Sequence, residues 1–195
     1  MKILKEFPYN RQAAVNYAHQ WAYRRNPAFY DFEEIGGDCT NFASQCILAG
    51  TGVMNFTETY GWYYLNVNHR SPSWTGVVYL YDFLTTNEGV GPYGVEVEQD
   101  AVQPGDICQL FMDKGRFQHS PVITVVDSPP TLGNIQVAAH SYDVDCRPLD
   151  TYNFKQIRFI HIQGYRAKAE KFPKPEPEKI KLPLGIALPF NNGTV

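Results

Sequence analysis

Apolar residues recur at helical spacing in three segments of the first half of the chain. The pattern of residues 11–25 follows Asn10 and the pattern of residues 74–89 follows Ser73, and both residue types cap helix starts. Between them, residues 39–50 place one face of a predicted helix along Cys39, Phe42, Ala43, Cys46, Ile47 and Gly50. The first half of the chain is therefore predicted to be mainly helical.

The second half changes to short apolar runs that are separated by turns rich in Pro, Gly and Asn. These runs predict strands at residues 95–98, 107–111, 117–126, 135–141 and 157–165. Because helices come first and an antiparallel meander follows, we expect the α+β class, with N-terminal helices packed on a small antiparallel sheet.

The last part of the chain has a different composition from the rest. A linker rich in Pro, Lys and Glu leads into an apolar segment that is full of helix breakers. We therefore expect one domain over residues 1–166, followed by an extended linker and tail over residues 167–195.

Composition narrows the partners that are worth considering. The chain has 195 residues, a formal net charge of -3 and no basic run before the tail, which argues against nucleic acid as a partner. No apolar segment is long enough to predict a membrane span, and no secretory signal is visible at the start. The expectation is a cytoplasmic protein, or a cell-wall protein if another route exports it. The sequence does not specify an oligomeric state.

Cys39 is the residue with the strongest claim to chemistry. It follows Gly36-Gly37 and stands in the first turn of a predicted helix, where partial positive charge favours a thiolate. We therefore expect a lowered pKa for this thiol. The remaining three cysteines lack C-x-x-C spacing and are interpreted as reduced, structural residues: Cys46, Cys108 and Cys146.

A nucleophilic thiol needs a base, and a histidine on a strand is the usual supplier. His119 begins one predicted strand and His140 lies on the next, so antiparallel pairing is expected to bring them side by side, with His140 orienting His119. Asp143 competes with His140 for this third role. A metal site of Cys39, His119 and His140 is a weaker alternative because metal-type spacing is missing. The remaining histidines have weaker claims: His19, His69 and His161.

Several spaced motifs together carry a resemblance to a known family. They are Tyr9-Asn10-Arg11, Arg25-Asn26-Pro27, Gly37-Asp38-Cys39-Thr40-Asn41-Phe42-Ala43-Ser44-Gln45, Trp62-Tyr63-Tyr64, His119-Ser120, Ala139-His140-Ser141 and Arg147-Pro148-Leu149. Over residues 8–166 the chain resembles the bacterial putative amidase domain family, which is related to NlpC-type cell-wall cysteine peptidases of the papain-like superfamily. The resemblance implies a papain-like core in which the helix of Cys39 packs on the sheet that carries His119, with His140 third in order.

The predicted function is that of a cysteine amidase or peptidase that cleaves an amide bond in a peptide or a peptidoglycan-like substrate. The predicted catalytic residues are Cys39, His119 and His140, and neither a cofactor nor a metal is expected. The predicted substrate-binding residues are Asp38, Trp62 and Tyr63. Two alternatives stay open: a non-catalytic binding module on the same fold, and an acyltransferase that uses the same triad.

Overall fold

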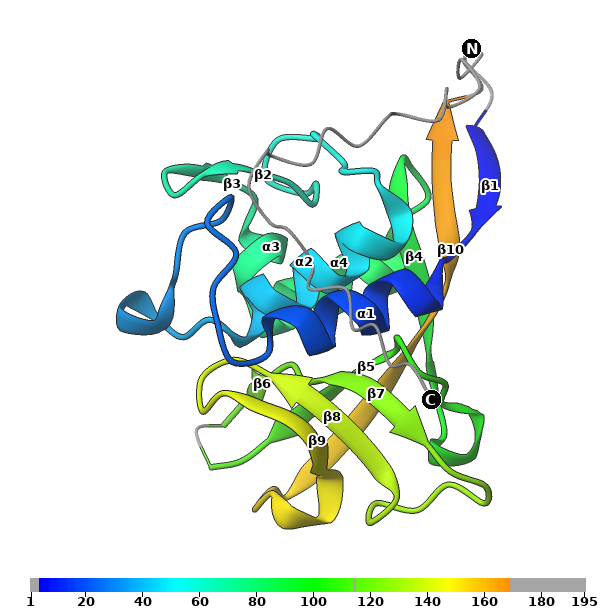
Figure 1. Ribbon diagram of the computed structural model, residues 1–195. Helices are drawn as coiled ribbons and strands as arrows, with labels where there is room; N and C mark the ends of the chain where they lie inside the picture. The colour runs from blue at the N-terminus through cyan, green and yellow to red at the C-terminus, as the bar shows by residue number, and fades with distance from the viewer. Residues whose placement is uncertain (1–3, 114, 169–195) are drawn as a thin grey trace, which may run out of the picture.

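The computed structural model describes residues 4–113 and 115–168, and it mixes helices with a mostly antiparallel sheet (Figure 1). The helices are α1 (Arg11–Trp21), α2 (Cys39–Thr51), α3 (Pro72–Thr75) and α4 (Val77–Thr86), with 3-10 turns η1 (Glu33–Ile35), η2 (Gln99–Ala101) and η3 (Leu149–Thr151). The strands are β1 (Leu4–Pro8), β2 (Tyr64–Asn66), β3 (His69–Arg70), β4 (Gly91–Val97), β5 (Ile107–Phe111), β6 (Phe117–His119), β7 (Val122–Val126), β8 (Ile135–Ala139), β9 (Val144–Pro148) and β10 (Gln156–Lys168).

One large sheet organises the described part of the chain. Its strand order is β1-β10-β5-β7-β8-β9, with β4 also pairing with β10 and β6 with β5, and the pairs are antiparallel. The long strand β10 links the two parts of this sheet, because β1 and β4 pair along its C-terminal part and β5 along its N-terminal part. Strands β2 and β3 form a separate two-stranded ribbon.

The predicted helices exist, and local chemistry explains their ends. The Asn10 side chain accepts a hydrogen bond from the backbone N–H of Ala13 at 3.0 Å and so caps α1, which ends at Trp21 and not at residue 25. Helix α2 ends at Gly52 in the left-handed conformation, φ 65°. The single helix predicted over residues 74–89 is instead two helices, because Gly76 between α3 and α4 has an extended backbone.

The strands also follow the predictions, with informative differences. The strand expected over residues 117–126 is broken at Ser120-Pro121 into β6 and β7, because proline has no N–H to donate to a ladder. Strands β1, β2, β3 and β9 were not predicted from the sequence. Strand β1 pairs with the end of β10 through Leu4 and Lys168, so the described fold continues two residues past the boundary expected at 166. The rest of the predicted linker and tail lies outside the described residues.

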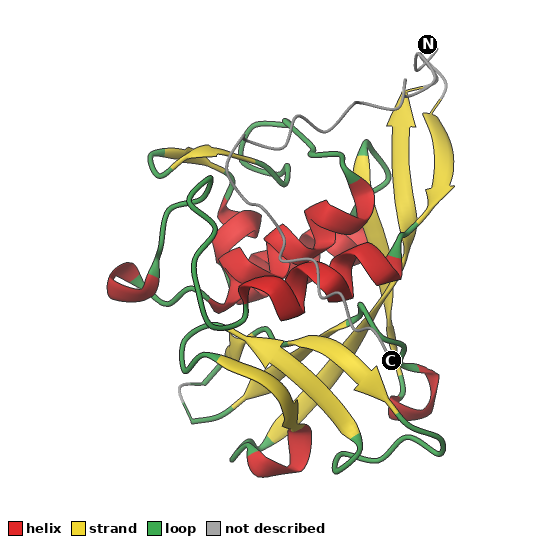
Figure 2. Ribbon diagram, viewed as in Figure 1, coloured by secondary structure: helices red, strands yellow, loops and turns green. Residues whose placement is uncertain are grey.

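The helices gather on one side of the sheet, as Figure 2 shows, and the central strands β5, β7 and β8 bury residues on both of their faces. Ile107 and Val122 pack into the core shared with the helices, whereas their neighbours Cys108 and Ile123 belong to a second core that also contains Leu149 of η3. Alternation of side chains along a strand explains this division. Among the described residues, no helix has the length and apolarity that crossing a membrane requires.

Candidate active site

Cys39 is the first residue of α2, as the sequence predicts, and its side chain is nearly buried at 7% exposure. The chain reaches it through Gly36 and Gly37, which have φ values of 122° and 95° that favour glycine. The Sγ atom lies 3.9 Å from the carbonyl oxygen of Gln118 and 3.7 Å from Oγ1 of Thr40. The fold therefore brings the helix start against the strand segment that carries His119.

The thiol of Cys39 does not have the lowered pKa that its position at a helix start predicted. Burial raises the pKa of Cys39, and hydrogen bonds from the backbone of Ser120 and from Thr40 oppose this only in part. The desolvation cost of a buried thiolate is the larger effect here. The Cys39 side chain is therefore held mainly as a neutral thiol in the structure as described.

His119 is the last residue of β6, where it lies opposite Leu110 of β5. Its side chain is 7% exposed, and burial lowers its pKa to about 4, with a smaller contribution from the charge of Arg147. Cys39 and His119 line one cavity of about 610 Å³. Two residues far apart in the sequence thus present a neutral thiol and a neutral imidazole to the same space.

His140 follows β8 and is 1% exposed. Its Nε2–H donates to the carbonyl oxygen of Trp21 at 2.9 Å, its Nδ1 lies 2.5 Å from Oδ2 of Asp38, and its ring stacks on Phe42 with centroids 4.0 Å apart. Both ring nitrogens therefore face partners other than His119. The hydrogen bond expected between His140 and His119 is therefore not formed, because Asp38 and the carbonyl group of Trp21 occupy the two ring nitrogens of His140.

Asp38 precedes the thiol and is fully buried. One carboxylate oxygen accepts hydrogen bonds from the backbone N–H of Phe32 at 2.9 Å and from Nδ2 of Asn41 at 2.8 Å, and the other oxygen contacts His140. The guanidinium of Arg25 lies 3.6 Å from that second oxygen. Asp38 is thus the centre of a polar network that holds the start of α2, and it does not line the cavity that contains Cys39.

The other residues proposed from the sequence lie elsewhere. Asp143 forms a two-pronged ion pair with Arg25, with N–O distances of 2.9 Å and 3.0 Å. Trp62 is fully buried and donates through Nε1 to Oγ of Ser44, and Tyr63 is 7% exposed. Neither aromatic residue lines the cavity of Cys39, because both pack where the helices meet the β2–β3 ribbon.

Among the side chains that line this cavity without having been predicted from the sequence are Glu33, Arg147 and Tyr152. The guanidinium of Arg147 lies over the Tyr152 ring at 3.8 Å and donates to Thr151. The Tyr152 ring is 5.7 Å from the His119 ring, and burial raises the pKa of its phenol to about 12. Arg147 lies in one of the motifs that carry the family resemblance, but no local pattern marks Glu33 or Tyr152, which the packing of η1 and η3 brings to the cavity.

The metal alternative draws no support from these positions. Within the described residues, the group of His, Cys, Asp and Glu side chains whose ligand atoms all lie within 4.8 Å of one another is His19, Asp145 and Cys146. That group lies outside the cavity of Cys39 and His119.

The protein is thus of mixed α/β structure. A thiol at the start of α2 and an imidazole at the end of β6 line the same cavity. The chain belongs to the family described as "Putative amidase domain", which matches residues 8–163. It is 35% identical over 144 residues to a protein of Bacillus subtilis (strain 168) described as "Uncharacterized protein YhbB". That match covers 71% of this chain and 43% of the relative, so the chain spans less than half of that protein's length. No solved structure matches. The description of the family names amide hydrolysis as its broad class of chemistry.

Proposed function

We propose that the protein is a cysteine amidase in which Cys39 is the nucleophile and His119 is the general base and acid. The observation that carries this proposal is that the buried thiol at the start of α2 and the ring at the end of β6 line one cavity of about 610 Å³. A cavity of this size holds several residues of a peptide. We also propose a papain-like core, because the helix that starts with Cys39 packs beside the antiparallel sheet that carries His119.

The proposed reaction has two steps. The Cys39 sulfur attacks the amide carbonyl carbon while its proton passes to His119, and the proton then goes to the leaving amine as the C–N bond breaks. Water next attacks the thioester carbon and gives a proton to His119. The C–S bond then breaks, His119 returns that proton to the Cys39 sulfur, and the carboxylic acid is released as the product. Because burial raises the pKa of Cys39 and lowers that of His119, proton transfer accompanies the attack and does not precede it.

We assign the backbone N–H of Cys39 as a hydrogen-bond donor to the oxyanion of the tetrahedral intermediate. N–H groups in the first turn of a helix have no acceptor within the helix, so this donor is available. His140 is assigned as a positioning residue that acts through Asp38. Its contacts hold Asp38 and the end of α1 together, and Asp38 immediately precedes the nucleophile. Asp143 is assigned to the ion pair with Arg25 and not to catalysis.

Arg147 is assigned as the residue that binds substrate, in place of Trp62 and Tyr63. Its guanidinium is held against Tyr152 at the cavity, where it suits a carboxylate of the bound peptide. Stem peptides of the peptidoglycan type carry free carboxylates beside amide bonds, and we propose them as the substrate class.

The experiment is incubation of the full chain with purified cell wall and with soluble stem peptides, followed by mass spectrometry of the released fragments. Cys39→Ala should abolish fragment release, whereas Cys46→Ala, the same change on the same helix but away from the cavity, should retain it. Full activity in Cys39→Ala would overturn the mechanism. Cleavage of other amides but not of stem peptides would overturn the substrate class alone, and no turnover of any amide would favour a binding module.

A further inference from the structure

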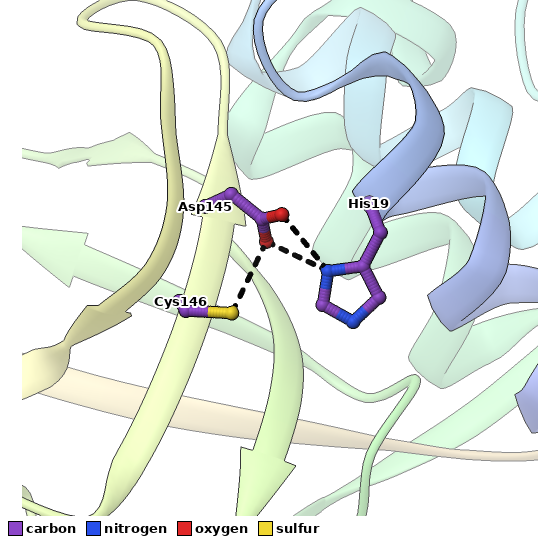
Figure 3. A group of neighbouring side chains, drawn as sticks. All are labelled: His19, Asp145 and Cys146. Atoms are coloured by element: carbon purple, nitrogen blue, oxygen red, sulfur yellow. Dashed lines mark hydrogen bonds and ion pairs between the residues drawn. The ribbon is translucent and has the colours of Figure 1, made fainter.

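A second group of side chains lies away from the cavity, where α1 meets β9. Figure 3 shows His19, Asp145 and Cys146 turned toward one another. Nδ1 of His19 lies 2.8 Å and 3.0 Å from the two carboxylate oxygens of Asp145, and Sγ of Cys146 lies 3.6 Å from one of them. All three ligand atoms lie within 4.8 Å of one another.

The backbone of β9 explains why two consecutive residues point to the same place. Neighbouring side chains normally alternate across a strand. Here Val144 pairs with Ala139 and Arg147 with Val137, so β9 has one more residue than β8 in this interval. Asp145 and Cys146 occupy that bulge.

Cys146 has a φ of 53°, a left-handed value that glycine adopts without cost and other residues seldom adopt. The bulge therefore keeps a cysteine at a position where the backbone favours glycine. This backbone and the bulge together bring the Cys146 thiol beside the Asp145 carboxylate. The backbone N–H of Asp145 also donates to the Tyr23 hydroxyl at 3.2 Å, which holds the bulge beside the end of α1.

We propose that His19, Asp145 and Cys146 form a binding site for a borderline divalent transition metal ion, with Zn²⁺ as the probe ion. A thiolate, an imidazole and a carboxylate are the ligand types of zinc, whereas calcium and magnesium take oxygen ligands. Tetrahedral zinc with ordinary bond lengths requires about 3.4 Å between its N and O ligands and about 3.6 Å between its S and O ligands. The observed N–O and S–O distances are within several tenths of an ångström of these values.

Binding replaces the contacts within the group by three bonds to the metal. The Cys146 thiol loses its proton to solvent, His19 binds through Nδ1 in its neutral form, and a water molecule completes the coordination. The ion would link the last turn of α1 to β9. Because Arg147 follows Cys146 and lines the cavity, the metal would also fix the strand that presents Arg147 there.

The test is zinc titration of the reduced, metal-free full chain against a chromophoric chelator, with Co²⁺ absorption reporting thiolate ligation. One ion should bind per chain. His19→Gln, Asp145→Asn and Cys146→Gly should each weaken binding by more than about tenfold, and Cys146→Gly should also lose the sulfur-to-cobalt band. Cys146→Gly is decisive because glycine suits the left-handed backbone, so lost binding there does not reflect misfolding.

Two controls locate the ion. His69→Gln removes an exposed histidine from β3 and should leave affinity unchanged, and so should Cys39→Ala. In the parent protein, zinc should also protect Cys146 from iodoacetamide, as peptide mapping would show. Absence of binding, full affinity in Cys146→Gly, or loss of the ion in Cys39→Ala would overturn the proposal, the last by placing the metal in the cavity of Cys39.

Discussion

Burial of His119 makes the folding free energy depend on pH in a way that can be calculated. The pKa of this ring is lowered from 6.5 to about 4, mainly by desolvation. In the unfolded chain the His119 ring binds a proton below about pH 6.5, whereas in the folded protein it stays neutral down to about pH 4. The unfolded state therefore binds more protons in this window, so stability falls as the pH falls through it.

The magnitude follows from the size of the window. At 1.36 kcal/mol for each pH unit, lowering a pKa from 6.5 to about 4 corresponds to a loss of about 3 kcal/mol between pH 7 and pH 4. This is a large part of the stability of an ordinary domain. His119→Gln removes the titrating ring, so its unfolding free energy should lack this component.

The assay is urea unfolding followed by tryptophan fluorescence at several pH values from 7 to 4, with linear extrapolation to water. The unfolding free energy of His119→Gln minus that of the parent should rise by about 3 kcal/mol as the pH falls. His69→Gln provides the control, since its ring is exposed in the folded protein as it is in the unfolded chain. If the parent and His119→Gln show parallel curves, the burial argument for His119 is refuted.

Three further predictions test the site and its frame. As the pH is lowered, kcat/KM for any amide substrate should decrease with a midpoint near pH 4 and not near pH 6.5, because His119 stays neutral down to about pH 4. A midpoint near pH 6.5 would contradict the assignment of His119 as the base. Gly37→Ala should destabilise the protein by about 1–2 kcal/mol, and by more than Gly36→Ala. Both glycines have positive φ, but only at Gly37 would the new Cβ lie 3.2 Å from Oγ of Ser141. Equal shifts of the melting temperature in the two variants would argue against this reasoning. Trp74→Ala should cost about 3–5 kcal/mol in urea unfolding, since the ring is fully buried, and a cost below about 1 kcal/mol would show that the ring is not part of the core.

Local chemistry made most of the elements predictable. The caps at Asn10 and Gly52 and the helical spacing that begins at Cys39 depend on residues near one another in the chain, so the sequence predicts α2 to within a residue. The same is true of β5, whose bounds agree with the prediction. Breaks such as Gly76 and Pro121 also depend on local chemistry, and they were visible as residue types, although their effect on the elements was missed.

The sequence was also sufficient to identify the candidate nucleophile and base, but it did not predict their pKa values. The helix start of Cys39 and the strand position of His119 are local properties. Their pKa values depend on how much water the fold removes, and burial reverses the effect expected from the helix start. The tertiary structure decides this because desolvation depends on what packs around a group and not on its neighbours in sequence.

Which residues meet was decided by packing between segments that are distant in the sequence. His140 contacts Asp38 at the start of α2 and Trp21 at the end of α1, so neither of its ring nitrogens is left for His119. Arg147 reaches the cavity only through the β9 bulge and η3. The sequence by itself determined the helices, most strands and the Cys39–His119 pair of candidates. The tertiary structure alone decided the partners of these residues, because contacts between distant segments depend on how helices and strands pack in the complete fold and not on neighbours in the sequence.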